Sequence, residues 1–306
     1  MLTVVIVAAL AAVTTANSAS DTYPPQVITR SRISQQCAGY CKDSSKFSLR
    51  PDSTYVYSYE GTTTSGVHGA SNETSIIKVT AKAHIQVTAS PCELILQIHE
   101  ASLLDSGMTE LQSADRQREF AKVLEANPLR FSYQDGRVEQ LCPAAEEAVW
   151  ALNLKRGLLS AFQNSMADLS RDAHLYERDV SGSCETTYSV KSSMWSDIKV
   201  LKNKDLQSCS GRGHQTLGLL STFSTKAKSV PIIKSEQFCE QTIKSDDGTY
   251  LSNSWCQETH IFAPFSNGQS GIRTTAELSL SLDNIVQSTE PILTDLFVNK
   301  RTDLQI

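Results

Sequence analysis

Apolar and polar residues alternate along several stretches of this chain, which predicts long β-strands. From Ile77 to Val87 the odd-numbered positions are apolar and the even-numbered positions are polar. Leu94, Leu96 and Ile98 continue as a second strand after a corner at Pro91-Cys92, and residues 272–283 near the other end of the chain alternate like Ile77–Val87. Tyr55–Tyr59 alternates aromatic and smaller residues. Successive side chains of a strand point to opposite faces, so each of these strands has one apolar and one polar face.

The segment from Trp150 to Phe162 has a helical period instead. Its apolar residues recur at steps of three and four and form one face of a helix, and two apolar residues after the segment continue the spacing. These residues are Ala151, Leu154, Leu158, Phe162, Met166 and Leu169. Lys155-Arg156-Gly157 interrupts this face with two charges and a flexible residue, and the charges must find water or acidic partners. A second, short helix is expected over Gln112–Leu124.

These elements predict one mainly β domain with some α structure. Strands with a single apolar face belong to an antiparallel sheet that is packed on one side only. We expect an antiparallel β-barrel, or a strongly curved sheet, wrapped around the amphipathic helix as its central helix. The inward positions of that helix are Trp150, Leu154, Leu158 and Phe162. Gly61–Glu73 is interpreted as a loop, and Gln134–Arg137 as a tight turn.

The N-terminus and the cysteines point to the secretory pathway. Residues 1–19 contain an apolar run of signal-peptide length, and a buried N-terminal strand or helix is the alternative. Residues 20–36 are polar, contain Pro24-Pro25 and are expected to form a loose arm. We therefore expect a secreted, extracellular protein, in which eight cysteines form a disulfide framework. The spacing leaves the pairing of these cysteines open.

The charge is unevenly distributed. The net charge of −5 does not suggest nucleic-acid binding, but residues 191–234 hold eight basic and two acidic residues. One interpretation is a solvated face whose lysines protect a strand edge. The other is a basic docking face for an acidic receptor module or a sulfated polysaccharide. The candidate basic docking face consists of Lys199, Lys202, Lys204, Arg212, Lys226, Lys228 and Lys234.

Sequence motifs for catalysis or metal binding are lacking, so we predict that the chain is not an enzyme. There is no GxSxG nucleophile elbow, and His99-Glu100 lacks the second histidine of HExxH. Cys37 and Cys41 have near-zinc spacing without a second pair, which favours disulfides. Asn72-Glu73-Thr74 is an N-glycosylation sequon in a secreted context, so Asn72 is expected to carry a glycan.

Several segments resemble, in the same order, the N-terminal domain of the large lipid transfer proteins, a family that includes vitellogenin, apolipoprotein B and apolipophorin. They span about residues 37–290 and favour apolipophorin over yolk vitellogenin. The main ones are Cys41-Lys42-Asp43, Tyr55–Glu60, Ser65–Gly69, Pro128–Phe131, Asp135–Val138, Leu154–Phe162, Gly182–Thr186 and Cys256–Phe262.

The resemblance implies a barrel of the lipovitellin type over residues 37–290, wrapped around a central helix. It also implies the disulfides Cys41–Cys92, Cys184–Cys209 and Cys239–Cys256, which leaves Cys37 with Cys142. Residues 291–306 would begin the connection to a helical domain that is absent here, so the chain is interpreted as a fragment, a truncated isoform or an isolated domain.

The resemblance implies lipid transport. Lipid would be the cargo of the full-length protein, no cofactor is implied, and this domain would have a non-catalytic role in assembly and docking. Its partners would be the helical domain, lipids in the full-length protein and a lipoprotein receptor or sulfated polysaccharide. The alternative is a secreted receptor- or polysaccharide-binding module that carries no lipid.

Overall fold

The structure is a computed structural model of the whole chain. It describes residues 38, 47, 49–68, 74–88, 90, 92–107, 110–194, 197–210, 233–246, 248–262, 271–288 and 302–305. The predicted signal peptide and N-terminal arm, the sequon at Asn72 and the cysteines at 37 and 41 lie outside these residues.

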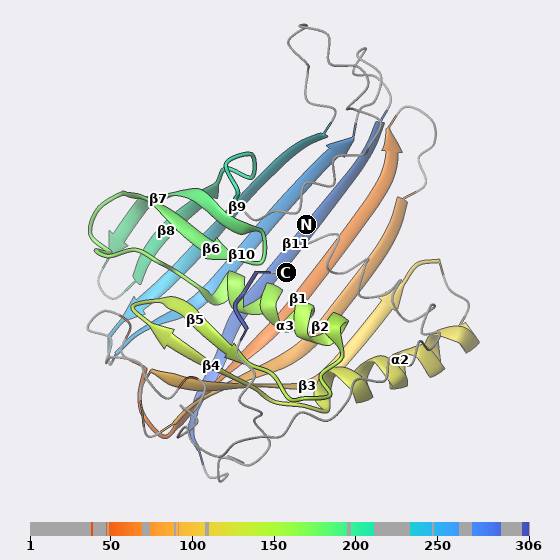
Figure 1. Cartoon of the computed structure of the whole chain (residues 1–306), viewed down its shortest axis with the longest axis horizontal. Coiled ribbons are helices and arrows are strands. Elements are labelled where there is room, and N and C mark those ends of the chain that lie inside the picture. The colour runs from red at the N-terminus through yellow and green to blue at the C-terminus, as the bar shows by residue number, and fades with distance from the viewer. Residues whose placement is uncertain are drawn as a thin grey trace, which may run out of the picture.

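The described chain consists of eleven strands and two helices, which Figure 1 labels. The first half contains β1 Ser53–His68, β2 Thr74–Val87, β3 Glu93–Asp105, α2 Glu110–Glu125, β4 Leu129–Gln134, β5 Arg137–Cys142 and α3 Val149–Phe162. The second half contains β6 Ala173–Asp179, β7 Gly182–Met194, β8 Asp197–Lys204, β9 Ile233–Ser245, β10 Thr249–Phe262 and β11 Gly271–Gln287.

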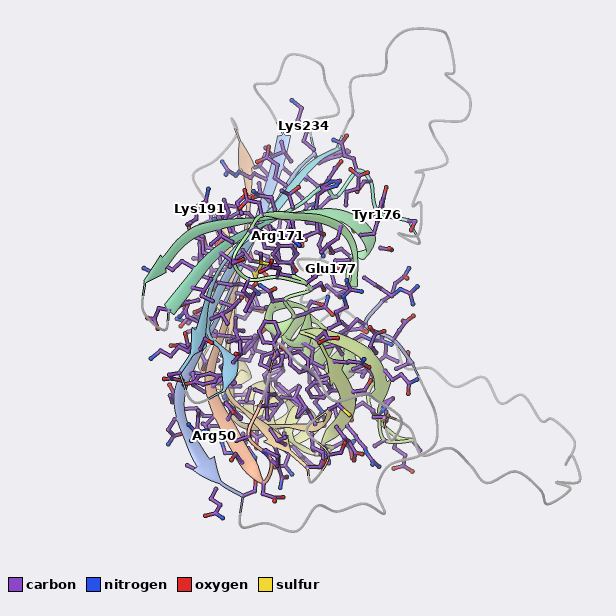
Figure 2. The ribbon with its side chains drawn as sticks, turned by 90° about the vertical axis from the view of Figure 1, so that its left-hand side faces the viewer. Arg50, Arg171, Tyr176, Glu177, Lys191 and Lys234 are labelled. Atoms are coloured by element: carbon purple, nitrogen blue, oxygen red, sulfur yellow. A yellow bond between two sulfur atoms is a disulfide. The ribbon has the colours of Figure 1, made fainter. Side chains whose placement is uncertain are left out.

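All eleven strands form one antiparallel sheet. Its order is β5-β4-β3-β2-β1-β11-β10-β9-β8-β7-β6, so the first and last long strands, β1 and β11, pair at its centre. Figure 1 shows α3 in front of this sheet, and Figure 2, turned by 90°, shows the sheet curving around the side chains that pack on α3. We call the face that α3 covers the inner face.

The expected closed barrel and a helix enclosed at its centre are not confirmed. In the part of the chain that the structure describes, β5 and β6 end the sheet and no ladder joins them. The carboxamide of Gln163, just after α3, lies between these two strands instead. It accepts a hydrogen bond from Val138 N of β5 at 2.9 Å and donates one to Arg178 O of β6 at 3.0 Å. One buried side chain thus spans the place where a closed barrel would have a ladder.

The predicted two-faced strands are confirmed. On β2 the inward residues Val79, Ala81, Ala83 and Ile85 are buried, whereas the polar residues between them are partly exposed. The cross-strand register continues this alternation over the neighbouring strands, so the inner face forms one apolar core with α3. The predicted helix at 112–124 is also present, as α2.

The predicted loop over Gly61–Glu73 is wrong for its first half, because β1 continues to His68. Glycine weakens strands in general, but at Gly61 a Cβ atom would lie 2.7 Å from Tyr59 Oη. The close approach of the Tyr59 ring therefore explains why glycine occurs inside this strand. The predicted turn at 134–137 is present between β4 and β5, with positive φ at Asp135 and Gly136.

Candidate functional site

Helix α3 provides the apolar side chains that fill the space against the inner face. Leu154, Leu158 and Phe162 are each at most 3% exposed. Trp150 is only partly buried, and its ring stacks on Phe120 of α2 with centroids 5.3 Å apart. The helix ends at Phe162, so Met166 is buried without belonging to it, and the helical spacing of 166 and 169 is a coincidence of sequence.

The two charges in the middle of α3 are buried and both have partners. Lys155 Nζ lies 2.8 Å from Glu147 Oε1 and also donates to Asn127 O. Burial lowers the pKa of the Lys155 ammonium, and the charge of Glu147 raises it again. Arg156 donates to the side chain of Asn153, one turn earlier in the helix. Lys155 and Arg156 thus make hydrogen bonds and an ion pair in the interior and do not form a solvated patch.

Arg156 also holds residues 302–305 at the end of the sheet. Its guanidinium donates to Thr302 Oγ1 at 2.7 Å and to Asp303 O at 3.1 Å. Thr302 and Leu141 of β5 exchange two backbone hydrogen bonds of 2.9 and 3.0 Å, and Leu304 is 1% exposed. The predicted role of 291–306 as a connection to a helical domain stays a prediction, but its described residues pack as part of this domain.

A buried ionic cluster lies on the inner face of β6 and β8. We call Glu177, Asp179, Lys202 and Lys204 the ionic cluster. Lys202 pairs with Glu177, Lys204 pairs with Asp179, and Lys204 Nζ is 3.7 Å from Glu177 Oε1. All four side chains are at most 2% exposed, and Tyr188 donates to Glu177. Figure 2 labels Glu177 of β6.

The predicted basic docking face is therefore wrong at Lys202 and Lys204. Both lysines face the interior, so neither is available to a partner on the surface. Lys199 is exposed on the opposite face of β8, three residues from Lys202, and Lys234 is exposed on β9. An odd spacing along a strand changes the face, which explains the division. The structure does not describe Arg212, Lys226 and Lys228. Among the described residues of the predicted docking face, Lys199 and Lys234 are exposed.

The ionic cluster predicts an acid-sensitive fold. Burial raises the pKa of Glu177, but the ammonium groups of Lys202 and Lys204 and the hydrogen bonds from Lys202 and Tyr188 lower it to about 2. The unfolded chain has the ordinary glutamate pKa, so the stabilisation is complete above about pH 4.3 and is lost as the pH falls toward 2.

We expect this loss to reach about 3 kcal/mol of the free energy of unfolding. Urea titrations between pH 6 and pH 2, with wild type and Glu177→Gln side by side, measure it. The stability difference between the two proteins should shrink as the pH falls through that window. A constant difference would contradict the assignment.

Two of the implied disulfides are present. Cys184 of β7 is bonded to Cys209, and Cys239 of β9 to its direct cross-strand partner Cys256 of β10. Cys92 and Cys142 are also disulfide-bonded. Their pairing with Cys41 and Cys37 stays a prediction, because those residues lie outside the described part of the chain.

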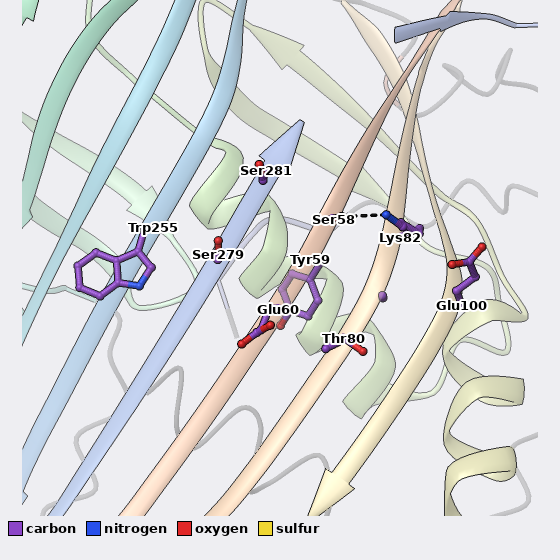
Figure 3. Close-up of a pocket in the computed structure, with 10 residues that line it drawn as sticks. Ser58, Tyr59, Glu60, Thr80, Lys82, Glu100, Trp255, Ser279 and Ser281 are labelled. Carbon is purple, nitrogen blue, oxygen red and sulfur yellow. Dashed lines mark hydrogen bonds between the residues drawn. The ribbon is translucent and has the colours of Figure 1, made fainter. Parts of the chain in front are cut away.

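The outer face of the sheet has a polar groove of about 560 Å³, which Figure 3 shows from the side opposite α3. Trp255 lines one end, and Glu60, Thr80, Ser279 and Ser281 line its middle. At the other end Lys82 Nζ lies 2.7 Å from Asp283 Oδ2 and 2.9 Å from Ser58 Oγ. Lys78 pairs with Glu60 at 2.8 Å, and Glu100 adds a further carboxylate to the lining.

One cluster of reactive side chains was missed by the motif search. His260 of β10 is hydrogen-bonded to Ser235 of β9 and to Glu258 of its own strand. Within the described ranges, no group of three His, Cys, Asp or Glu side chains is arranged to hold a metal ion. Neither of the two described helices has the length and apolarity that crossing a membrane requires.

Comparison with known proteins gives consistent matches. A family model described as the vitellogenin N-terminal domain matches residues 49–290. A vitellogenin of Penaeus merguiensis is 32% identical over 234 residues, which are 75% of this chain and 8% of that protein. Apolipophorins of Locusta migratoria are 29% identical over 262 residues, which are 84% of this chain and 7% of that protein. Apolipoprotein B-100 of Rattus norvegicus is 27% identical over 241 residues, or 75% and 5%.

The fold also matches a solved structure described as lipid-protein interactions in lipovitellin. The TM-score is 0.65 at 21% sequence identity, and the match covers 79% of this chain and 26% of that one. This likeness shows a lipovitellin-like fold. The chain spans less than a tenth of the length of the three relatives named above.

Proposed function

Because the chain belongs to the vitellogenin N-terminal domain family, a family of lipid-transport lipoproteins, we propose that it serves as the N-terminal assembly and docking domain of a secreted lipoprotein of the apolipophorin or vitellogenin kind. Lipid is the cargo of the full-length protein in this proposal. Carrying lipid requires no bond-making step, so the transport role itself is non-catalytic. Secretion and a glycan at Asn72 are parts of the same proposal.

We propose that this domain assists assembly while other parts of the full-length protein carry the lipid. The observation that supports this proposal is the filled inner face of the sheet. Leu158 and Leu159 of α3 are fully buried, and Phe162 packs on Tyr57 and Tyr133 with ring centroids 5.8 and 5.0 Å away. The space against α3 is thus occupied by the chain's own side chains. This supports a folded platform that helps a lipoprotein assemble rather than a container for lipid.

A domain exchange tests the proposal. Residues 49–290 replace the matching segment of the Penaeus merguiensis vitellogenin, and the chimera is expressed in insect cells. We expect secretion of a particle of low buoyant density, whereas the chain alone is secreted as a folded monomer without a large lipid load. Density-gradient centrifugation followed by lipid extraction measures both.

The control is the same vitellogenin with the segment deleted, which we expect to be retained in the cell. A chimera that is retained like the deletion, although its exchanged domain carries the Cys184–Cys209 and Cys239–Cys256 disulfides, would contradict the assembly role. Extraction of many lipid molecules from the chain alone would contradict the proposal that this domain does not itself carry the lipid.

A further inference from the structure

Three polar side chains form a continuous relay on the inner face of β9 and β10. Ser235 and His260 are direct cross-strand partners, and Ser235 Oγ lies 2.7 Å from His260 Nδ1. His260 Nε2 lies 2.6 Å from Oε1 of Glu258, two positions earlier on the same face of β10. A hydroxyl is thereby joined to a carboxylate through one imidazole.

The carboxylate of the relay is buried, whereas the other two groups are partly exposed. The Glu258 side chain is 1% exposed, the His260 side chain is 17% exposed, and Ser235 is half-buried. The carboxylate is therefore held in the interior, where it can orient the imidazole, while the imidazole and the hydroxyl are partly exposed. A nucleophile, a base in hydrogen-bond contact with it and a third group that orients the base are the arrangement that activates a serine.

An apolar row borders the relay on the same face. The strand register places Thr274 of β11 and Ser65 of β1 in one row with Ser235 and His260. The next row toward the strand ends contains Phe262, Ile272 and Val67. Ile272 and Val67 are 45% and 43% exposed, although they point to the face that is apolar and buried farther down the sheet. An apolar strip that begins at Phe262, one row from His260, and continues over β11 and β1 fits the acyl chain of an ester.

We propose that Ser235 is an activated nucleophile that accepts acyl groups from carboxylic esters with apolar acyl chains. Ser235 Oγ attacks the carbonyl carbon, and its proton passes to His260 Nδ1. The C–O bond to the alcohol breaks, and His260 returns the proton to the departing alkoxide. Water then attacks the acyl-serine with the same base, which releases the carboxylic acid and restores the hydroxyl. Glu258 is a positioning residue that orients His260 and stabilises its charged form.

This activity goes beyond the transport role and does not depend on it, so its failure leaves the domain exchange unaffected. The probe is an alkyl fluorophosphonate, which forms a Ser Oγ–P bond and loses fluoride. We expect labelling that approaches one phosphonyl group per chain, located at Ser235 by peptide mass spectrometry. Hydrolysis of p-nitrophenyl hexanoate should be detectable and should stop after labelling.

The variants separate chemistry from folding. Ser235→Ala should abolish labelling, and His260→Gln should slow it at least tenfold, with thermal midpoints near that of the wild type. Glu258→Gln should slow labelling, and Glu258→Asp, which keeps the carboxylate, should restore part of the rate, which a merely structural role would not do. Ser279→Ala, on the outer face, is the matched control and should label like the wild type. Absence of labelling in the folded wild type, or equal labelling of Ser235→Ala, would overturn the proposal and leave the relay as a strand-to-strand contact.

Discussion

Glu177→Gln should destabilise the protein by about 3–5 kcal/mol, because it removes one partner of a buried ion pair and leaves the ammonium groups undercompensated. Glu177 pairs with Lys202 and lies 3.7 Å from Lys204, all in the interior. The glutamine has nearly the same shape as the glutamate, so the loss is electrostatic rather than steric. Equilibrium unfolding in urea at pH 7, followed by far-UV circular dichroism, measures it.

Two further variants make the result specific. Glu60→Gln removes a carboxylate that pairs at 2.8 Å with Lys78 on the exposed outer face, and should cost at most about 1 kcal/mol. The double variant Glu177→Gln/Lys202→Met should recover part of the stability, because it removes the second charge as well. A double variant no more stable than Glu177→Gln would contradict the assigned pairing.

The ionic cluster also changes how surface docking has to be tested. Reversing the charges of Lys202 and Lys204 would place carboxylates beside Glu177 and Asp179 in the interior and unfold the domain. Loss of polysaccharide binding in such a variant would therefore report on folding. Lys199 is exposed on the opposite face of the same strand and is the suitable position for charge reversal.

The strands and helices were predictable because one inner face dominates the pattern. Alternation from Ile77 to Val87 predicted β2, and the helical spacing of Leu154, Leu158 and Phe162 predicted α3. The closed barrel was not predictable in this way. Whether β5 and β6 meet depends on the side chain of Gln163 and on the segment at Thr302, and neither has a periodic signature.

The buried charges could have been predicted only in part. The spacing of Lys199, Lys202 and Lys204 already shows that 202 and 204 share the face opposite to 199. The partners Glu177 and Asp179 have the same two-residue spacing on β6, but only the strand order brings the two pairs together. The relay of Ser235, Glu258 and His260 depends likewise on the register of β9 against β10, so a search for contiguous motifs misses it.

Phe162→Ala should lower the free energy of unfolding by roughly 3–5 kcal/mol, about as much as Glu177→Gln. The substitution opens a cavity where α3, β1 and β4 meet. Phe162 is 1% exposed, and its ring contacts Tyr57 of β1 and Tyr133 of β4, with centroids 5.8 and 5.0 Å away. These strands are held by their own ladders and the following Gln163 by its hydrogen bonds, so the cavity cannot collapse freely. Urea unfolding should show a lower midpoint with an unchanged m-value.

Phe162→Leu keeps most of the volume and should cost less than the alanine variant, on the order of 1.5 kcal/mol. Val149→Ala, at the first position of the same helix, removes a side chain that is 72% exposed and should change the stability by no more than about 0.5 kcal/mol. The loss of stability should therefore be largest for Phe162→Ala, smaller for Phe162→Leu and smallest for Val149→Ala. This order follows if α3 stabilises the domain by filling the inner face. Equal losses for the three variants would mean that the sheet is held by its ladders and disulfides alone, with α3 as an attachment.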